Sequence, residues 1–367
     1  MTGTIAADWP DVVRLRGACD SAAAYYERTL RDSAVARCYM VQRGWTALAE
    51  TGAEADRWRP GFGPQRAHGL VDHLRLAGFT EQETVDAGLG RQSQWGLVDR
   101  FRHRLVFPLV DDQSVIGFVG RALPGSMSDA PKWLNSPTTV LYDKGQHLFG
   151  LRQNADRWSA GHGPVLVEGA GDAIAVSLAG RAAVAPLGTG LTGHHVAALA
   201  GAIPRNRPLV VAFDADPPGR RALLHAHQLV RDRPATASTF EEGADPGVYA
   251  TTGRIAELRD RLEAARPLAA AVVDIRLDDW TRVLDHPGGQ IDAVRDVVSI
   301  ITSNPDLAGP LVQQVARRAG LTSAEASHVV IDAFLGDPPS RQSRAEVGNL
   351  SGFVPAAAAS RRRSPAR

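Results

Sequence analysis

Two stretches of the sequence decide the fold, VLVEGAGDAIAV at residues 165–176 and LVVAFDAD at residues 209–216. Each begins with a short apolar run, turns through acidic residues and leads into a segment whose apolar side chains have helical spacing. The same alternation of apolar runs and helical segments, joined by short links, extends from residue 164 to residue 240. It predicts an α/β fold with a parallel sheet that helices cover on both faces.

Acidic residues follow the strands of this predicted sheet. Glu168 comes directly after the first run, Asp214 and Asp216 come after the second, and Asp245 follows the last predicted strand. Right-handed crossovers bring the carboxyl ends of parallel strands to one edge of the sheet, where ligands bind in such folds. Asp214 and Asp216 are two positions apart, so extended backbone would point both carboxylates the same way. We therefore expect the four side chains at one edge.

A cluster of carboxylates in a half-buried cleft is unfavourable unless cations neutralise it. Oxygen ligands without His or Cys favour Mg²⁺ or Mn²⁺ over zinc, and such ions suit phosphoryl or nucleotidyl transfer. Gly169 and Gly219 would let the backbone approach a phosphate closely. The alternative for each strand-end acid is to cap the helix that follows. Asp172 could likewise cap its helix or lie behind the metal ligands, and we favour the second role.

Upstream of the sheet, residues 104–110 and 115–123 are apolar runs separated by the polar sequence DDQS, and they predict a β-hairpin. Helical segments precede this hairpin, and a Pro/Gly-rich sequence, RPGFGP at 59–64, breaks the chain between them. Among the 41 basic residues the lysines are Lys132 and Lys144. A chain that otherwise uses arginine has lysine at these two places either by chance or because a compact charge is required there.

The order of these motifs resembles the catalytic core of bacterial DnaG-type primases. The Toprim part of that family contains an EGxxD turn, an LGT turn, a DxD and a final acidic DPD; here VLVEGAGDAIAV is followed by APLGTGLT, VVAFDADPPGRRA and EEGADPG. Three earlier stretches resemble the polymerase part of the family: FTEQETVDAGL, DRFRHRLVFPLVDDQSVIGFVGRAL and APKWLNSPTTVLYDKGQHLFGL. The likeness runs from around Ala22 to Asp245 and continues more faintly towards residue 336. An EGxxD alone would be a weak signal, whereas the ordered set is specific.

The resemblance implies which residues carry the chemistry. Glu168, Asp214 and Asp216 would be catalytic, and together with Asp245 they would bind two Mg²⁺ or Mn²⁺ ions. The second acid of the DPD motif is Gly247 here, which removes one carboxylate. The family's basic ridge, which binds template and incoming nucleotide, would comprise Arg121, Lys132 and Lys144, with Asn135 and Ser136 beside it. Arg100 and Arg102 resemble template-side residues of the family, and together with Asn135 they complete the expected set that binds template and nucleotide. Both lysines therefore fall on ridge positions.

Other side chains near these motifs are less specific. Arg104 continues an alternating strip with Arg100 and Arg102, for which the alternative is a solvated strand face. Trp133 and Phe149 could stack on bases, although core packing is favoured for each. Four histidines, for which solvated or core roles are favoured, lie on predicted helices: His194, His195, His225 and His227.

The composition is that of an ordinary globular protein. The 367 residues are 44% hydrophobic and carry a net charge of +1; the last seven, RRRSPAR, contribute +4 and leave −3 for the rest, so a basic surface must be local. Cys19 and Cys38 cannot make a four-ligand zinc site or a disulfide framework, and we expect no zinc in this chain. The sequence pattern supports neither a membrane span nor a signal peptide. We expect a cytoplasmic protein that works at the nucleoid or replication fork.

The resemblance also implies partners and domains. Single-stranded DNA template and ribonucleoside triphosphates would be the ligands, without a membrane. A replicative helicase or a separate zinc-ribbon protein would be a further partner, since the family's own zinc ribbon and helicase-binding domain are not recognised here. The expected parts are a flexible N-terminus at 1–17, a mixed α/β subdomain with the ridge at 18–155, a Toprim metal-binding domain at 156–262, a helical subdomain at 263–336 and a disordered basic tail at 337–367.

The leading hypothesis is a primase-type RNA polymerase that makes short primers on single-stranded DNA. A Toprim nuclease would use the same site to cleave nucleic acid, and a topoisomerase would need a tyrosine nucleophile and a strand-passing domain that the sequence does not indicate. A phosphatase of the haloacid dehalogenase type, with Asp214 as nucleophile and Asp216 as acid, would need a lysine further along, and none follows Lys144. A non-catalytic nucleic-acid or nucleotide-binding protein stays open as the fourth hypothesis.

Overall fold

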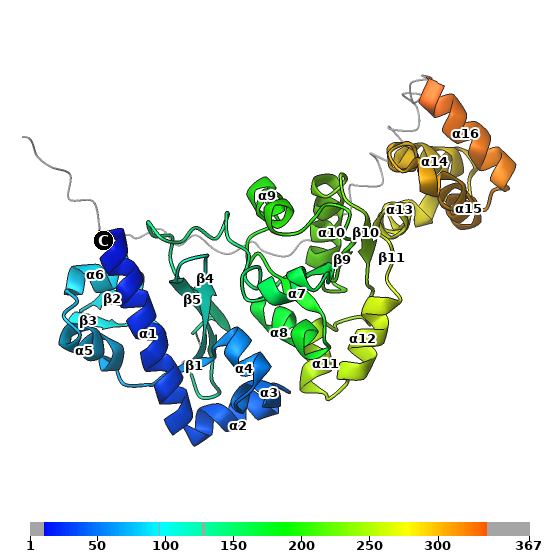
Figure 1. The fold of residues 1–367 in the computed structure, drawn as a ribbon. Coiled ribbons are helices and arrows are strands. Elements are labelled where there is room, and N and C mark those ends of the chain that lie inside the picture. The colour runs from blue at the N-terminus through cyan, green and yellow to red at the C-terminus, as the bar shows by residue number, and fades with distance from the viewer. Residues whose placement is uncertain (1–10, 95, 127–128, 336–367) are drawn as a thin grey trace, which may run out of the picture. The chain divides into compact units, whose positions relative to one another are not determined.

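The structure is a computed structural model that describes residues 11–94, 96–126 and 129–335. It divides into two compact units, the first ending at Leu268 and the second beginning at Ala269. Figure 1 shows the helices and strands of both. The division therefore falls slightly later than the predicted start of the helical subdomain at residue 263, and the predicted tail at 337–367 lies outside the described residues.

The first unit begins with helices. Helix α1 starts at Val12, and the side chain of Asp11 caps it by accepting hydrogen bonds from two backbone N–H groups of its first turn. The prediction of a flexible N-terminus is therefore wrong for residues 12–17, while residues 1–10 lie outside the described part of the chain. The helices of this part are α1 (Val12–Asp32), α2 (Ala34–Gln42), α3 (Thr46–Ala49), α4 (Ala53–Trp58), α5 (Gly69–Leu76) and α6 (Glu81–Asp86).

An antiparallel sheet packs against α1, as Figure 1 shows. Its four strands have the order β1-β4-β5-β6, and β2 (Gly90–Ser93) and β3 (Gly96–Asp99) form a separate two-stranded ribbon. The predicted hairpin is confirmed as β4 (Arg104–Val110) and β5 (Val115–Ala122). Strand β1 (Gly61–Gly63) lies where the sequence indicated a break, and β6 (Trp133–Asn135) adds a strand next to β5.

Strand β1 shows why RPGFGP is not simply a break. A Cβ atom at Gly61 would lie 2.5 Å from the Cβ of Tyr26 on α1, and one at Gly63 would lie 1.9 Å from the carbonyl oxygen of Phe101. The strand therefore passes so close to its neighbours that only glycine fits at these two positions. A Pro/Gly-rich pattern cannot by itself distinguish such a strand from a turn.

The predicted parallel sheet is present in the second half of the unit. Strands β10, β9, β7 and β8 are parallel in that order, and the short strand β11 adds an antiparallel edge that the sequence did not reveal. The strands are β7 (Pro164–Leu166), β8 (Ala182–Val184), β9 (Leu209–Val211), β10 (Ala235–Ala237) and β11 (Arg266–Pro267). The helices around it are α7 (Ala155–Ser159), α8 (Ala170–Leu178), α9 (Gly193–Ala202), α10 (Pro217–Leu229), α11 (Pro246–Thr251) and α12 (Ile255–Glu263).

One hydrophobic core runs through both halves of the first unit. It includes Trp45 and Phe107 from the N-terminal half and Val165, Ala173 and Tyr249 from the half that holds the parallel sheet. The predicted boundary at 155/156 coincides with the start of α7 and lies inside this single compact unit.

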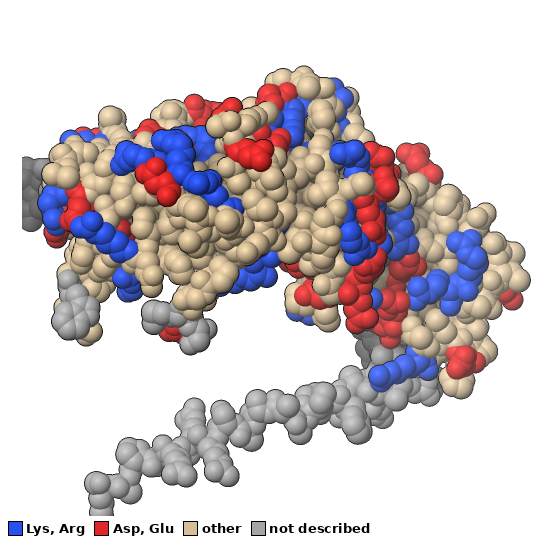
Figure 2. Space-filling model, turned by 90° about the horizontal axis from the view of Figure 1, so that it is seen from below, with Lys and Arg blue, Asp and Glu red and all other residues tan. Residues whose placement is uncertain are grey.

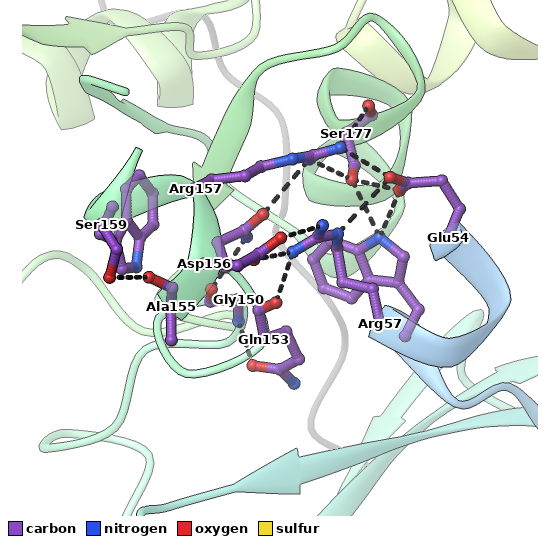
Figure 3. A network of polar contacts seen from close by, with 12 residues as sticks. Glu54, Arg57, Gly150, Gln153, Ala155, Asp156, Arg157, Ser159 and Ser177 are labelled. Atoms are coloured by element: carbon purple, nitrogen blue, oxygen red, sulfur yellow. Dashed lines mark hydrogen bonds and ion pairs between the residues drawn. The ribbon is translucent and has the colours of Figure 1, made fainter. Parts of the chain in front are cut away.

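A network of polar contacts joins the two halves (Figure 3). Glu54, on α4, receives hydrogen bonds from Arg157 at 2.6 Å and from the Ser177 hydroxyl at 2.5 Å. The indole N–H of Trp58 donates to Ser177 Oγ at 3.1 Å. Arg57 pairs with Asp156 on the other side of the network. Arg157 and Glu54 have side chains only 14% and 17% exposed, so this ion pair is largely desolvated.

The second unit is helical, in agreement with the sequence pattern. Helix α13 begins at the last residue of the first unit, and the following helices pack on one another through buried aliphatic side chains such as Val297, Leu311 and Val330. The elements are α13 (Leu268–Asp278), η1 (Thr281–Val283), α14 (Pro287–Thr302), η2 (Pro305–Leu307), α15 (Ala308–Ala319) and α16 (Ser323–Leu335). Within the described residues, no helix of either unit combines the length and apolar character that crossing a membrane requires.

The substitution Glu54→Ala tests how much the ion pair between Glu54 and Arg157 contributes to the stability of the first unit. Glu54→Ala leaves the Arg157 guanidinium buried without its carboxylate, and we expect a loss of about 3 kcal/mol in the free energy of unfolding. Urea titration followed by tryptophan fluorescence measures this loss. Asp232→Ala is the control, because its ion pair with Arg205 is 3.6 Å long and exposed, and it should change stability by less than about 0.5 kcal/mol. Equal effects of the two substitutions would contradict the assignment.

Candidate active site

The acidic residues that follow the parallel strands lie together at one edge of the sheet. Glu168 follows β7 and Asp214 follows β9, the neighbouring strand. The backbone N–H of Asp214 donates a hydrogen bond to Glu168 Oε1 at 3.2 Å, which joins the two strand ends directly. Asp216 and Asp245 are close enough for their charges to act on both of these carboxyls. The expected convergence of the four acids is therefore found.

Crowding and burial perturb the acids strongly. Burial, followed by the charge of Glu168, raises the pKa of Asp214 to about 7. Burial also raises the pKa of Glu168. For Asp172, burial and the charge of Asp245 raise the pKa to about 8. Carboxyls that resist ionisation in this way are the ones that a bound cation would stabilise most.

Asp216 and Asp245 also act as helix caps. Asp216 Oδ1 accepts from Gly219 N at 2.7 Å at the start of α10, and Asp245 Oδ1 accepts from Val248 N at 2.6 Å at the start of α11. Capping and ligand binding do not exclude each other, because each carboxylate has a second oxygen. In the described part of the chain, no three His, Cys, Asp or Glu side chains are already arranged around a common metal position.

Asp172 lies close to the cluster, because the charges of Asp245, Asp214 and Glu168 all act on it. It lies in the first turn of α8 but does not cap that helix; its Oδ1 accepts from the N–H of Gly247 at 3.1 Å. A Cβ atom at Gly247 would lie 3.1 Å from Asp245 Oδ1 and 3.2 Å from Asp172 Oδ1. The glycine that replaces the second acid of the DPD motif thus leaves room for both neighbouring carboxylates and donates its N–H to that of Asp172.

The surroundings of Asp214 fit a bound cation. Its Oδ1 is buried and has no hydrogen-bond partner among the described residues. A Cβ atom at Gly219 would lie 2.1 Å from Asp214 O and 3.0 Å from Glu168 Oε1, so glycine is needed for α10 to start this close to the acids. A buried carboxylate oxygen without a donor needs a partner, and a divalent cation is one that suits an all-oxygen donor set.

Part of the predicted ridge faces the acids. The positive charge of Lys132, which directly precedes β6, acts on Asp214 and lowers its pKa. Arg121 is buried on β5, donates from Nε to the Tyr39 hydroxyl at 3.0 Å, and holds its guanidinium 5.3 Å from the ring centre of Trp133. On the face of the molecule seen in Figure 2, basic and acidic side chains lie interspersed, in keeping with the small net charge.

Other residues predicted to bind template or nucleotide, or to lie beside those that do, make structural contacts within the protein. Asn135 Nδ2 donates to the carbonyl of Leu187 at 2.8 Å, and Arg100 Nη2 donates to the Asn135 carbonyl at 3.2 Å. Ser136 is buried, and its hydroxyl accepts from the N–H of Phe118. The charge of Arg102 acts on Asp99, the side chain that caps α5.

The alternating basic strip at 100–104 does not form. Residues 100–103 make a turn, and Arg104 is buried and donates to the carbonyls of Gly120 and Pro131. The strip is thus neither a solvated strand face nor a continuous binding surface, and Arg104 has a structural role. Phe149 is buried in the core as favoured, next to Trp58.

Sequence reasoning missed Arg43. It lies just after α2, with its guanidinium 5.6 Å from the ring centre of Trp45, and its charge acts on Asp172 and Asp245. Burial and the like charge of Arg121 lower its pKa, and its Nε–H has no hydrogen-bond partner among the described residues. Two neighbouring guanidinium groups beside the acids supply the charge and the N–H donors by which arginines bind phosphates. No local pattern marks Arg43, because its neighbours in space are far away in the sequence.

Comparison with known proteins agrees with this geometry. Residues 25–155 match the family model of the DNA primase catalytic core, N-terminal domain, and residues 165–249 match a Toprim-like model. A DNA primase of Mycobacterium tuberculosis is 32% identical over 321 residues, which are 84% of this chain and 49% of that protein. The crystal structure of the RNA polymerase domain of M. tuberculosis primase DnaG in complex with double-stranded DNA superposes with a TM-score of 0.71 at 31% identity, covering 85% of this chain and 99% of that one. A DnaG primase catalytic domain bound to single-stranded DNA gives a TM-score of 0.66 at 28% identity, with 85% and 98% covered.

The chain belongs to the DnaG primase family. The resemblance inferred from the ordered motifs is thereby confirmed, as is the Toprim-type parallel sheet with a mixed α/β part before it and a helical part after it. The chain spans about half the length of the curated DnaG primases that it matches. Toprim primases generally use divalent metal ions, and in this chain the acids at the sheet edge are the residues suited to bind them.

The raised pKa values of the buried acids predict how the free energy of unfolding of this chain depends on pH. Between the unfolded pKa of an aspartate, about 4, and the folded pKa of Asp214, about 7, the folded state binds more protons than the unfolded state. In EDTA, the free energy of unfolding should therefore fall as the pH rises from 4 to 8, and Asp172 extends this trend. Asp214→Asn removes the ionising group and should stabilise the protein at pH 8 by about 1 kcal/mol after solvent screening.

Urea titrations at several pH values check this expectation. The groups that face Asp214 are Glu168, Asp216, Asp245 and Lys132, and the substitution leaves all four in place. Asp232→Asn, at an exposed ion pair, is the control and should leave the pH profile unchanged. A wild-type stability that rises between pH 5 and pH 8 in EDTA would contradict the assignment.

Proposed function

We propose that this chain synthesises short RNA primers on single-stranded DNA by metal-assisted nucleotidyl transfer, acting as a DNA-directed RNA polymerase of the primase type. Family membership supports this proposal. The observation that carries it is the carboxylate cluster at the sheet edge, where Glu168 accepts from the N–H of Asp214 and Asp214 Oδ1 is buried without a donor among the described residues. The charge of Lys132 acts on Asp214, so a cation that could bind phosphate lies close to this cluster. Nucleotidyl transfer needs both, since the triphosphate must be held and its charge neutralised.

Glu168, Asp214, Asp216 and Asp245 would hold the ions, with Asp172 behind them. When bound, Mg²⁺ or Mn²⁺ neutralises phosphate charge and makes the primer 3′-hydroxyl more acidic. The chain prepares this site by keeping Asp214 Oδ1 without a donor and by fixing Glu168 through the N–H of Asp214. Because Asp216 and Asp245 each use one oxygen to cap a helix, the helices hold their second oxygens in place.

The cationic residues would bind the nucleic acid and the nucleotide. Lys132, whose charge acts on Asp214, would contact the incoming triphosphate. The guanidinium groups of Arg43 and of the buried Arg121 would add positive charge near Asp172 and Asp245. The exposed Lys144 would contact the template backbone, and the partly exposed Arg102 and Arg100 would extend this surface. Asn135 would act mainly by holding the loop at Leu187.

The proposed partners follow from the relatives. Solved DnaG structures contain single-stranded or double-stranded DNA, and we infer that this chain takes single-stranded DNA as template and ribonucleoside triphosphates as substrates. A replicative helicase or a separate zinc-ribbon protein would direct it to its start sites, which places its work at the replication fork in the cytoplasm. Within the part of the chain described here, Cys19 is buried and Cys38 is exposed, and we propose no zinc site for them.

Primer synthesis on heteropolymeric single-stranded DNA is the direct test. With Mg²⁺ or Mn²⁺ and ribonucleoside triphosphates, the wild-type protein should make short oligoribonucleotides, and EDTA should abolish the product. Glu168→Gln should lower the rate at least about a hundredfold, because it removes charge that neutralises the cation cluster. Gel analysis of radiolabelled products measures both effects.

Glu81→Gln, at an exposed position on helix α6, is the matched control and should keep the wild-type rate. A wild-type protein as inactive as Glu168→Gln would contradict the proposal. Incubation of labelled single-stranded DNA with metal and no nucleotides completes the experiment. Cleavage of that DNA, abolished by Glu168→Gln, would support a Toprim nuclease instead.

A further inference from the structure

The first turn of α9 contacts the loop that carries Lys144. Thr192 is the N-cap of this helix, and its hydroxyl accepts from the N–H of His195 at 3.1 Å. The same hydroxyl donates to the carbonyl of Gly145 at 2.7 Å, and His195 Nε2 lies 2.9 Å from the carbonyl oxygen of Lys144. The first turn of α9 thus holds two consecutive carbonyls of the loop that carries Lys144, those of Lys144 and Gly145.

The partners of His195 determine its protonation state. Its Nδ1 faces the N–H of Thr192 at 3.2 Å and must accept, so it carries no proton. Its Nε2 faces a carbonyl, which can only accept, so Nε2 must carry the proton. The ring is completely buried, and burial lowers its pKa, which agrees with a neutral imidazole. Both ring nitrogens are therefore used, and neither is available for a metal or a substrate.

We propose that His195 is a positioning residue for DNA binding: by holding the Lys144 carbonyl, it fixes the backbone from which the Lys144 ammonium group reaches the template. The side chain of Lys144 is exposed, and because a lysine has a long flexible stem, the place of its backbone decides which positions its ammonium group can reach. Its backbone is defined by the clamp of Thr192 and His195. The proposal rests on the proposed function only in taking Lys144 as a DNA-binding residue.

Further contacts made by residues 185–195 support the positioning role proposed for His195. Just before α9, the carbonyl of Leu187 accepts from Asn135 Nδ2, and Ala185 pairs with Phe149 through two backbone hydrogen bonds. Residues 185–195 therefore contact the segment 135–149 at three places: at Asn135, at the carbonyls of Lys144 and Gly145, and at Phe149. Leu187 adopts a positive φ of 54°, a conformation that costs free energy for a leucine and is kept where surrounding contacts fix it. Among these contacts, Asn135 uses its own side chain to bind Leu187, whereas His195 binds the backbone of Lys144 and leaves the lysine side chain exposed.

Two substitutions at His195 distinguish its bond to the Lys144 carbonyl from its bond with the N–H of Thr192. Asparagine keeps an acceptor near the position of Nδ1 and loses the group that reaches the Lys144 carbonyl. Glutamine is long enough to present an amide N–H close to the position of Nε2. We expect His195→Asn to weaken binding of a labelled single-stranded oligodeoxynucleotide about threefold to tenfold, the effect of one lost neutral hydrogen bond, and His195→Gln to retain most of the affinity.

The salt dependence and a double-mutant cycle identify Lys144 as the residue through which His195 acts. Lys144→Ala should weaken binding and reduce the slope of log K against log salt by about 0.7, the value of one phosphate contact on a single strand. His195→Asn should reduce the slope in the same direction. In the Lys144→Ala background, His195→Asn should cause no further loss. Fluorescence anisotropy measures all four proteins, and His227→Asn, on α10 and outside the clamp, is the control.

Each contrary result overturns the proposal. Additive effects of the two substitutions would show that His195 acts on something other than Lys144, and unchanged binding of His195→Asn would show that the carbonyl contact positions nothing. Unchanged binding of Lys144→Ala would remove Lys144 from the DNA-binding surface and the proposal with it. Thr192→Val, which removes the hydroxyl bond to Gly145, is the second variant if His195→Asn does not fold, with the same pattern expected. Because the readout is DNA binding, absence of primer synthesis would contradict the proposed reaction and leave the clamp standing.

Discussion

The mutual repulsion of carboxylates held at low hydration is the constraint on which the rest of this structure depends. Glu168 and Asp214 share a hydrogen bond at adjacent strand ends, and Asp172 lies behind them. Burial and neighbouring negative charge raise the pKa of all three. Such a cluster opposes folding at neutral pH, so the surrounding fold must supply free energy to maintain it, and cations recover part of that cost when they bind.

The remainder of the first unit provides that support. Its core is continuous across both halves, and the desolvated pair of Glu54 and Arg157 joins α4 to α7. Helix N-termini face Asp216 and Asp245 with backbone N–H groups, which stabilises their negative charge. The positive charge of Lys132 does the same for Asp214 from the other half of the unit. The acid cluster is thus stabilised by charge from both halves of the first unit.

The sequence predicted the acids more completely than the cations. Acids follow strand ends, and the geometry of parallel sheets brings strand ends to one edge, so Glu168 and Asp214 could be placed without a structure. No comparable rule of topology predicts from the sequence which basic residues will lie near the acids. Arg104 alternates with Arg100 in the sequence, yet it is buried against carbonyl groups, while Arg43 shows no pattern and lies beside the acids. A surface assembled from separate segments leaves no periodic signal in any one of them.

The sequence by itself determined the alternation of strands and helices, the hairpin, the acid set and the family, because each of these depends on local periodicity or on residues a few positions apart. Only the tertiary structure decided which cations face the acids, that Gly61 and Gly63 form a strand, and that His195 holds the loop of Lys144. These features arise from close approach between segments that are distant in the chain. Which atoms then face one another depends on how the whole core packs, and packing is a property that no single segment encodes.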